Sequence, residues 1–203
     1  MRKLLSVILL LVCVASSAPA QSMRSIFLNA PDAVFPLLTK NLRADMVDYV
    51  EAGMEAKITN RLDGVSVLKE LADDYLLLAM TASSTMQLKL LPIVDDTIIC
   101  MVKSVKAEAA DSRVYFYDKE WNLLDSGELF AYPSISDFFT SATAECMDIC
   151  DIYLVALALS ADDNTLVAEY TMPAYMSSDD AKKVKPLLRK LVYRWNGERF
   201  VID

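Results

Sequence analysis

The chain has 203 residues, is 54% hydrophobic and carries 20 basic against 28 acidic residues, with no histidine and only four glycines. The missing histidine excludes Ser-His-Asp and Cys-His catalysis, H-E-x-x-H metalloproteases and histidine-ligated metal sites. Gly53, Gly64, Gly127 and Gly197 lie too far apart for a P-loop or a G-x-G-x-x-G turn, so nucleotide binding by a glycine-rich loop is excluded as well.

The first twenty residues have the pattern of a secretory signal peptide. Arg2 and Lys3 precede an apolar run from Leu4 to Ala15, and small residues then lead to an A-x-A cleavage site at Ala18–Ala20. The apolar run has twelve residues, whereas a membrane span needs about 20, so cleavage is favoured over a permanent anchor. Cys13 lies inside the run and follows a bulky residue, which disfavours a lipoprotein. We therefore expect export to the periplasm or the cell surface.

Cleavage leaves residues 21–203, which we expect to form a single domain without a membrane span; an alternative is a division near residues 125–133. Loss of Arg2 and Lys3 leaves 18 basic and 28 acidic residues, a net charge of −10. Such a chain repels phosphate backbones and anionic membrane surfaces, and no cluster of Lys and Arg stands out in it. Nucleic acid is therefore not an expected partner.

The mature chain is expected to begin with helices. Residues 22–53 read as a short helix, an interruption at Pro36, and a second helix that Gly53 stops. The second helix has one apolar stripe with four-residue spacing, made by Leu42, Met46, Val50 and Met54. A stripe of this kind is more typical of a core face than of a ligand surface.

From residue 57 the apolar period changes to two, which is typical of strands. A short helical turn is expected at residues 65–71. Strands at about ten-residue spacing with short connectors indicate an antiparallel meander. The expected strands cover residues 57–62, 75–81, 86–91, 97–106 and 113–117.

The second half again reads as helix followed by sheet. A helix is expected at residues 134–144, with a longer alternative that reaches Cys150, and another at 177–190, where Ser177 caps the start and Pro186 strains the end. Hairpins are expected from residues 151–159 with 165–171, and from 191–195 with 198–202 around Asn196-Gly197. The sequence therefore predicts an α+β fold, an antiparallel sheet with helices packed mainly on one side, or two weakly similar helix-then-sheet modules.

Three stretches carry a resemblance to a known family: Lys57-Ile-Thr-Asn-Arg-Leu-Asp-Gly64, Leu88-Lys-Leu-Leu-Pro92, and Ala110-Asp-Ser-Arg-Val-Tyr-Phe-Tyr-Asp118 with Glu120-Trp121. The chain resembles small exported Bacteroidales proteins that are known only as a domain of unknown function. The resemblance spans most of the mature chain and implies a two-membrane bacterium, with a periplasmic or surface-exposed protein. It carries no catalytic or binding residue.

Three cysteines remain after cleavage: Cys100, Cys146 and Cys150. One interpretation is three small core residues, because free cysteine is among the most buried residue types. Another is one disulfide, between Cys146 and Cys150 at one-turn spacing or from Cys100 to either of them. A catalytic thiol is disfavoured because no histidine is present to activate it.

The acidic and aromatic turn residues are the remaining candidates for interaction. Asp95 and Asp96 form one of four Asp-Asp pairs, which turns and helix caps explain better than calcium loops. Trp121 and Trp195 fit cross-strand clamps better than sugar platforms. All four residues are kept as interaction candidates, and no metal or cofactor is expected.

These patterns favour an exported, non-enzymatic protein that binds another macromolecule or an envelope component. One specific alternative is an inhibitor of an exported hydrolase, with the loop at Asp95-Asp96 inserted into a basic cleft of its target. The rival from another class is a small carboxylate-dependent, glycosidase-like hydrolase, which requires two acids across a cleft and a raised pKa for one of them.

Overall fold

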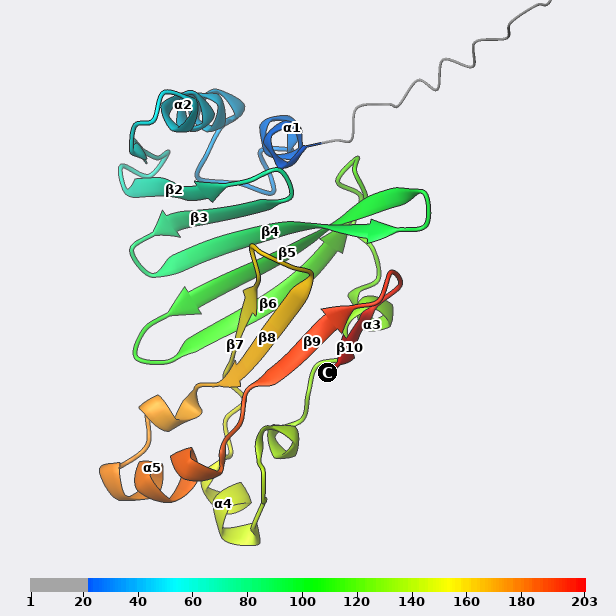
Figure 1. Ribbon diagram of the computed structural model, residues 1–203. Helices are drawn as coiled ribbons and strands as arrows, with labels where there is room; N and C mark the ends of the chain where they lie inside the picture. Colours follow the sequence, from blue (N-terminus) through cyan, green and yellow to red (C-terminus); the bar gives the residue numbers. More distant parts are fainter. Residues whose placement is uncertain (1–21) are drawn as a thin grey trace, which may run out of the picture.

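The computed structural model describes residues 22–203, so the predicted signal peptide and Cys13 lie outside the described residues. Two antiparallel sheets and several short helices make up this region (Figure 1). The predicted α+β fold, with its meander and with helices on one side, is confirmed. Within residues 22–203, no helix combines the length and the hydropathy that a bilayer crossing requires.

The larger sheet is a six-stranded meander in which each strand pairs with its neighbour in the sequence, in the order β1-β2-β3-β4-β5-β6. Two-residue turns such as Val94-Asp95 connect long neighbouring strands, which is why the pairing follows chain order. The strands are β1 (Ala56–Thr59), β2 (Val65–Leu71), β3 (Tyr75–Thr81), β4 (Ser84–Ile93), β5 (Asp96–Lys106) and β6 (Ala110–Tyr117).

The smaller sheet has four strands in the order β10-β9-β8-β7. It is built from the two hairpins expected in the second half of the chain, and it lies against the six-stranded sheet (Figure 1). Its strands are β7 (Val155–Leu159), β8 (Thr165–Tyr170), β9 (Leu191–Trp195) and β10 (Phe200–Ile202).

Two groups of helices flank the sheets. The helices α1 (Met23–Asn29) and α2 (Lys40–Glu51) begin at the caps Ser22 and Thr39 and pack on the six-stranded sheet. The other helical segments are short and occur in the second half of the chain: α3 (Ser126–Leu129), η1 (Ile135–Phe138), α4 (Ala144–Ile149), η2 (Met172–Ala174), α5 (Ser178–Val184) and η3 (Lys185–Leu187).

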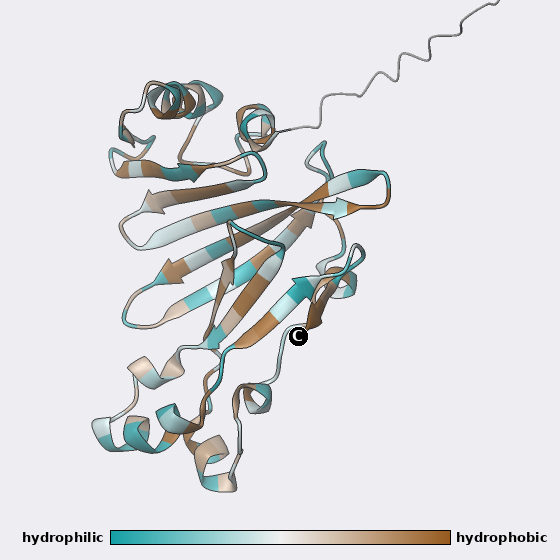
Figure 2. Ribbon diagram, in the orientation of Figure 1, coloured by the Kyte–Doolittle hydropathy of each residue, from teal (hydrophilic) through white to brown (hydrophobic). Residues whose placement is uncertain are grey.

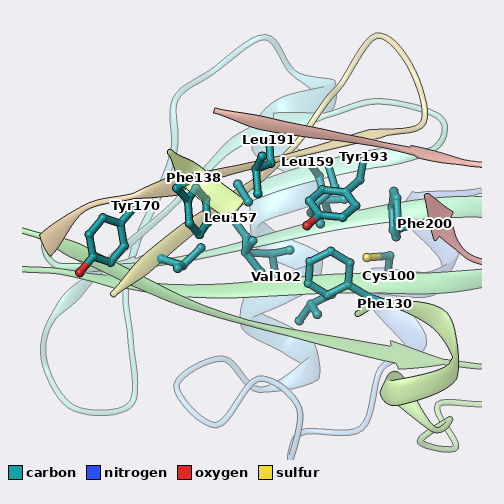
Figure 3. Packing of buried hydrophobic residues seen from close by; sticks show 14 of the residues in the cluster. Cys100, Val102, Phe130, Phe138, Leu157, Leu159, Tyr170, Leu191, Tyr193 and Phe200 are labelled. Atoms are coloured by element: carbon teal, nitrogen blue, oxygen red, sulfur yellow. The ribbon is translucent and has the colours of Figure 1, made fainter. Parts of the chain in front are cut away.

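The six-stranded sheet is buried on both faces, which gives the molecule two cores. Along β5, Cys100 and Val102 face the four-stranded sheet, while Ile99 and Met101 face α1 and α2. This alternation is the period-two pattern of a strand covered on both sides. Figure 3 shows the core between the sheets, where Cys100 and Val102 lie among side chains such as Leu157 and Phe200. Apolar residues follow the strands of both sheets in the hydropathy view of Figure 2.

Strand β7 is an edge strand, but side chains of the other sheet cover that edge. The backbone N–H groups of Val155, Leu157 and Leu159 donate to Asp111 Oδ1, Ser112 Oγ and Gln87 Oε1, at N···O distances of 3.3, 3.0 and 3.0 Å. An open strand edge is a template for unwanted pairing. The need to satisfy the N–H groups of β7 therefore explains why polar residues such as Gln87 and Ser112 lie between the two sheets.

Replacement of one such acceptor is expected to destabilise the fold. Ser112→Ala leaves the buried N–H of Leu157 without its partner, which costs about 1–3 kcal/mol of unfolding free energy. Ser104 is a matched control, since its hydroxyl lies 2.7 Å from that of Ser112 and is not bonded to β7. Urea unfolding of both variants gives the comparison, and equal losses for Ser112→Ala and Ser104→Ala would contradict the role assigned to the β7 contact.

Four details of the fold differ from the expectation. Residues 65–71 form β2 instead of a helical turn. In the predicted stripe of α2, Leu42, Met46 and Val50 do pack on the core, but Met54 lies beyond the helix end and is 54% exposed; the fully buried positions of the helix are Arg43, Met46 and Val47. The segment 134–150 contains only η1 and α4, and Pro186 ends the regular helix near residue 184, so α5 is half the expected length.

Candidate functional site

Charge is distributed unevenly along the described chain. Residues 22–181 contain 11 basic and 26 acidic residues, a net charge of −15, whereas residues 182–203 contain seven basic and two acidic ones, a net charge of +5. Between Ala181 and Gly197 there are six Lys or Arg residues and no Asp or Glu. The expectation that no basic cluster stands out is therefore wrong, because the acidic residues in the rest of the chain hide this basic segment in the net charge.

A cleft of about 520 Å³ receives part of this basic segment. One wall comes from the end of β5 and the start of β6, with Lys106 and Glu108. The opposite wall comes from η3 and the residues after it, with Lys185, Arg189 and Lys190. Small side chains line much of the space between these walls: Ala109, Ala110, Ala156 and Ala174.

Two prolines shape the wall of the cleft. Pro173 lies in the first turn of η2, and the chain turns there from the end of β8 toward α5. Pro186 prevents the α-helical pattern of α5 from continuing, so the chain passes through η3 and becomes extended at Leu188. Lys185, Arg189 and Lys190 consequently lie on a short irregular segment at the cleft, instead of around a continuous helix.

The cations of the cleft differ in their partners. Lys190 Nζ lies 2.8 Å from Glu169 Oε2, and Arg189 Nε donates to the backbone carbonyl of Asp137 at 3.0 Å. Lys106 and Lys185 are exposed and make no ion pair with any residue of 22–203. They come from opposite walls, so an anion in the cleft has a free cation on each side.

A second cleft, of about 560 Å³, shares Pro173, Ala174 and Lys185 with the first. It adds Lys182, whose ammonium lies 3.3 Å from Asp179 Oδ1 in an exposed pair. The ammonium of neighbouring Lys183 bonds Glu145, and this hydrogen bond raises the pKa of Lys183. Both lysines of α5 are thus paired with carboxylates, and the helix is coloured largely hydrophilic in Figure 2.

The two predicted aspartates lie at the β4–β5 turn and are not equivalent. Asp96 lies 2.7 Å from Lys119 Nζ, and its pKa is lowered mainly by the hydrogen bond from Lys119. Asp95 adopts a left-handed conformation (φ 59°) beside Val94, which is 85% exposed. Asp95 and Val94 are therefore the parts of this loop that remain available to a partner.

Both tryptophans are buried, so neither presents a ring face to solvent. Trp121 packs on Phe35 and Tyr117 in the core under the helices, with an unpartnered indole N–H. Trp195 stacks on Phe116 and donates from Nε1 to the carbonyl of Pro92 at 2.6 Å. These rings fill the two cores, and Trp195 also ties the sheets together.

All three described cysteines are buried free thiols in the core between the sheets. Burial raises the pKa of Cys100 well above its usual value and raises that of Cys150. This arrangement matches the interpretation as core residues. A disulfide in the oxidised protein stays a prediction.

Comparison with known proteins places the chain in a family. A family model described as "Protein of unknown function (DUF3256)" matches residues 15–200. The chain belongs to the DUF3256 family. The resemblance to a Bacteroidales domain of unknown function is thereby confirmed.

A solved structure supports the DUF3256 assignment. This chain is similar to "a domain of an uncharacterized protein from Porphyromonas gingivalis W83", with 26% sequence identity and a TM-score of 0.78. The match covers 88% of this chain and 97% of the other. A search of curated proteins found no match. The comparisons thus establish the family and the fold of this DUF3256 protein.

Proposed function

We propose that this DUF3256 protein is an exported binding protein that recognises an anionic group of another macromolecule or of an envelope component. The binding site is the cation-lined cleft between the β5–β6 turn and η3. The observation that carries the proposal is the pair of exposed, unpaired lysines, Lys106 and Lys185, on opposite walls of one cleft in a strongly acidic chain. Export rests on the leader pattern of residues 1–20.

Electrostatics supports the cleft as a binding site. The rest of the described chain is strongly negative, so a cationic cleft does not arise from average composition, and it attracts anions at short range. At physiological ionic strength the Debye length is about 8 Å, so the local charge governs a group inside the cleft more than the distant acids do. Carboxylate and phosphate groups are the chemistry that such lysines bind.

The residues described give the hydrolase alternative little support. Every buried charged side chain of residues 22–203 is a cation. Where a shift is resolved for a carboxyl group, the pKa is lowered, as at Asp118 and Asp137, mainly through hydrogen bonds. A glycosidase acid requires a raised pKa. The inhibitor alternative rests on the exposed loop at Val94-Asp95. An assay of exported hydrolases in the presence of the protein tests this alternative.

Phosphocellulose chromatography tests the proposal, since a protein of net charge −10 should pass through a polyanionic resin unless it has a local cationic site. We expect the mature protein to be retained at low salt. We expect Lys106→Glu with Lys185→Glu to remove retention, because the variant reverses the charge of both walls.

The matched control is Lys57→Glu with Lys69→Glu, which gives the same net charge on exposed lysines of β1 and β2. The cleft is supported as the binding site if the column retains the control variant and does not retain the cleft variant. Passage of the unmodified protein through the column, or equal behaviour of the two variants, contradicts it.

A further inference from the structure

Strand β10 forms the second outer edge of the four-stranded sheet, and its backbone is open. The N–H of Asn196 donates to Arg199 O, and the N–H of Asp203 donates to Val192 O. Hydrogen-bonded pairs alternate along an antiparallel ladder, so the backbone N–H and C=O of Val201, which pairs with Arg194, also point toward β9. The N–H and C=O groups of Phe200 and Ile202 therefore point away from the sheet.

A groove of about 540 Å³ runs beside this edge, between β10 and the segment after α3. Phe130 and Tyr132 line it together with Phe200, and the rings of Phe130 and Phe200 lie 6.2 Å apart. Ile202 also borders the groove and is 55% exposed. The β10 edge thus combines two outward N–H groups and two outward carbonyls with an apolar side chain and an apolar recess.

We propose that β10 pairs with β10 of a second copy of this chain, antiparallel and across a twofold axis at Val201. In this register Phe200 of each copy lies opposite Ile202 of the other. Both residues point their backbone groups outward, so each pair exchanges two N–H···O bonds, four bonds in all. The exposed Ile202 of each copy then lies on the side of the sheet where the other copy has its groove.

Charge complementarity selects a second copy as the occupant. The twofold register places Arg199 opposite Asp203 of the other copy, twice. This is a pair without direct backbone bonds, whose side chains approach most closely. Within one chain Asp203 already lies 3.0 Å from Arg194, and its side chain is 50% exposed. At each end of the joined strands, Asp203 thus lies between Arg194 of its own chain and Arg199 of the other copy. The two four-stranded sheets together form one continuous sheet of eight strands.

Paired charge reversals test the interface by sedimentation velocity over a concentration series. In Arg199→Asp the register sets two carboxylates against each other at each end of the joined strands, and in Asp203→Arg it sets two guanidinium groups against each other. Each variant alone is expected to dimerise at least about tenfold more weakly than the unmodified protein. A 1:1 mixture of the two variants is expected to recover the dimer, because both ends of the mixed pair balance in charge.

The control Arg61→Asp reverses an exposed arginine outside the groove and is expected to dimerise like the unmodified protein. Thermal unfolding of each variant shows that the monomers are folded. A monomer at all concentrations up to about 1 mM, above the dissociation constants of even small specific interfaces, overturns the proposal. A mixture that stays monomeric, or a dimer that both reversals leave unchanged, overturns it as well.

Discussion

Replacement of Arg43 by Met is expected to destabilise the protein by about 3–5 kcal/mol, because three buried carbonyls lose their donors at about 1–3 kcal/mol each. The guanidinium is fully buried among the carbonyls of the α1–α2 connection. It donates to Phe27 O at 3.0 Å, Leu38 O at 2.7 Å and Ala30 O at 2.5 Å, and Nη1 also lies 2.9 Å from Asp32 Oδ1. Met fills a similar volume but leaves three carbonyls without a donor.

Chemical unfolding of Arg43→Met and Arg43→Lys separates charge from shape. Lys retains the charge, but one ammonium does not span carbonyls that the planar guanidinium reaches in several directions, so we expect a large loss for this variant too. Arg24→Met is the control, since Arg24 pairs with Glu51 at the surface of the same two helices. A stability of Arg43→Met equal to that of Arg24→Met would show that the connection does not depend on the guanidinium.

Stability is expected to be nearly constant from about pH 5.5 to 8, to begin falling above about pH 8.5 and to fall steeply above about pH 10. The constant range follows from the absence of histidine. The first loss follows from burial that raises the pKa of the Cys100 and Cys150 thiols, because above about pH 8.5 an unfolded thiol releases its proton while the buried thiol keeps it. The steep fall follows from tyrosines whose pKa is raised by burial; for Tyr153 it rises to about 12. The others with a raised pKa are Tyr75, Tyr117, Tyr170 and Tyr193.

The sign follows from proton binding. A tyrosine with a folded pKa above its unfolded value near 10 holds its proton longer in the folded state, so its stabilising contribution is complete below about pH 10 and lost as the pH rises through the folded pKa. Lowered aspartate pKa values, as at Asp163, act oppositely and lose stability below about pH 4. Urea midpoints from about pH 5 to 11 test both limits. A transition between about pH 6 and 8 would contradict the prediction, and Tyr153→Phe should reduce the alkaline loss.

The sequence patterns predicted most strands because apolar alternation and turn residues agree there. The expected bounds of β3 and β9 match the structure. Strand β2 was missed because its register shifts between Leu68 and Glu70, which breaks the alternation and leaves Leu-Lys-Glu-Leu to resemble a helix. The helix expected at residues 134–144 is replaced by η1 and α4, because side chains bond the backbone locally where these two segments begin. Asp137 Oδ2 accepts from the Ser134 N–H, and Thr143 Oγ1 accepts from the Cys146 N–H.

The candidate site was harder to predict than the fold. Its cations are contiguous in sequence only on the wall that contains Lys185, whereas Lys106 joins them from the end of a distant strand. A count of charge in windows along the chain would have found the basic segment, but the opposite wall depends on how the two sheets pack. The buried position of Arg43 also has a signal in the sequence, because a charged residue four positions before Val47 lies on the otherwise apolar face of α2.

The side chains that cover β7 limit how this protein can change by mutation. In each contact one partner is a backbone N–H, at Leu157 or Leu159, and the other is a side chain, at Ser112 or Gln87. No second substitution on β7 other than proline changes this donor, because every other residue presents the same backbone N–H. Variation at Ser112 and Gln87 is therefore restricted to side chains that accept a hydrogen bond at the same height above the sheet, while β7 itself is free to exchange its residues for others of similar volume.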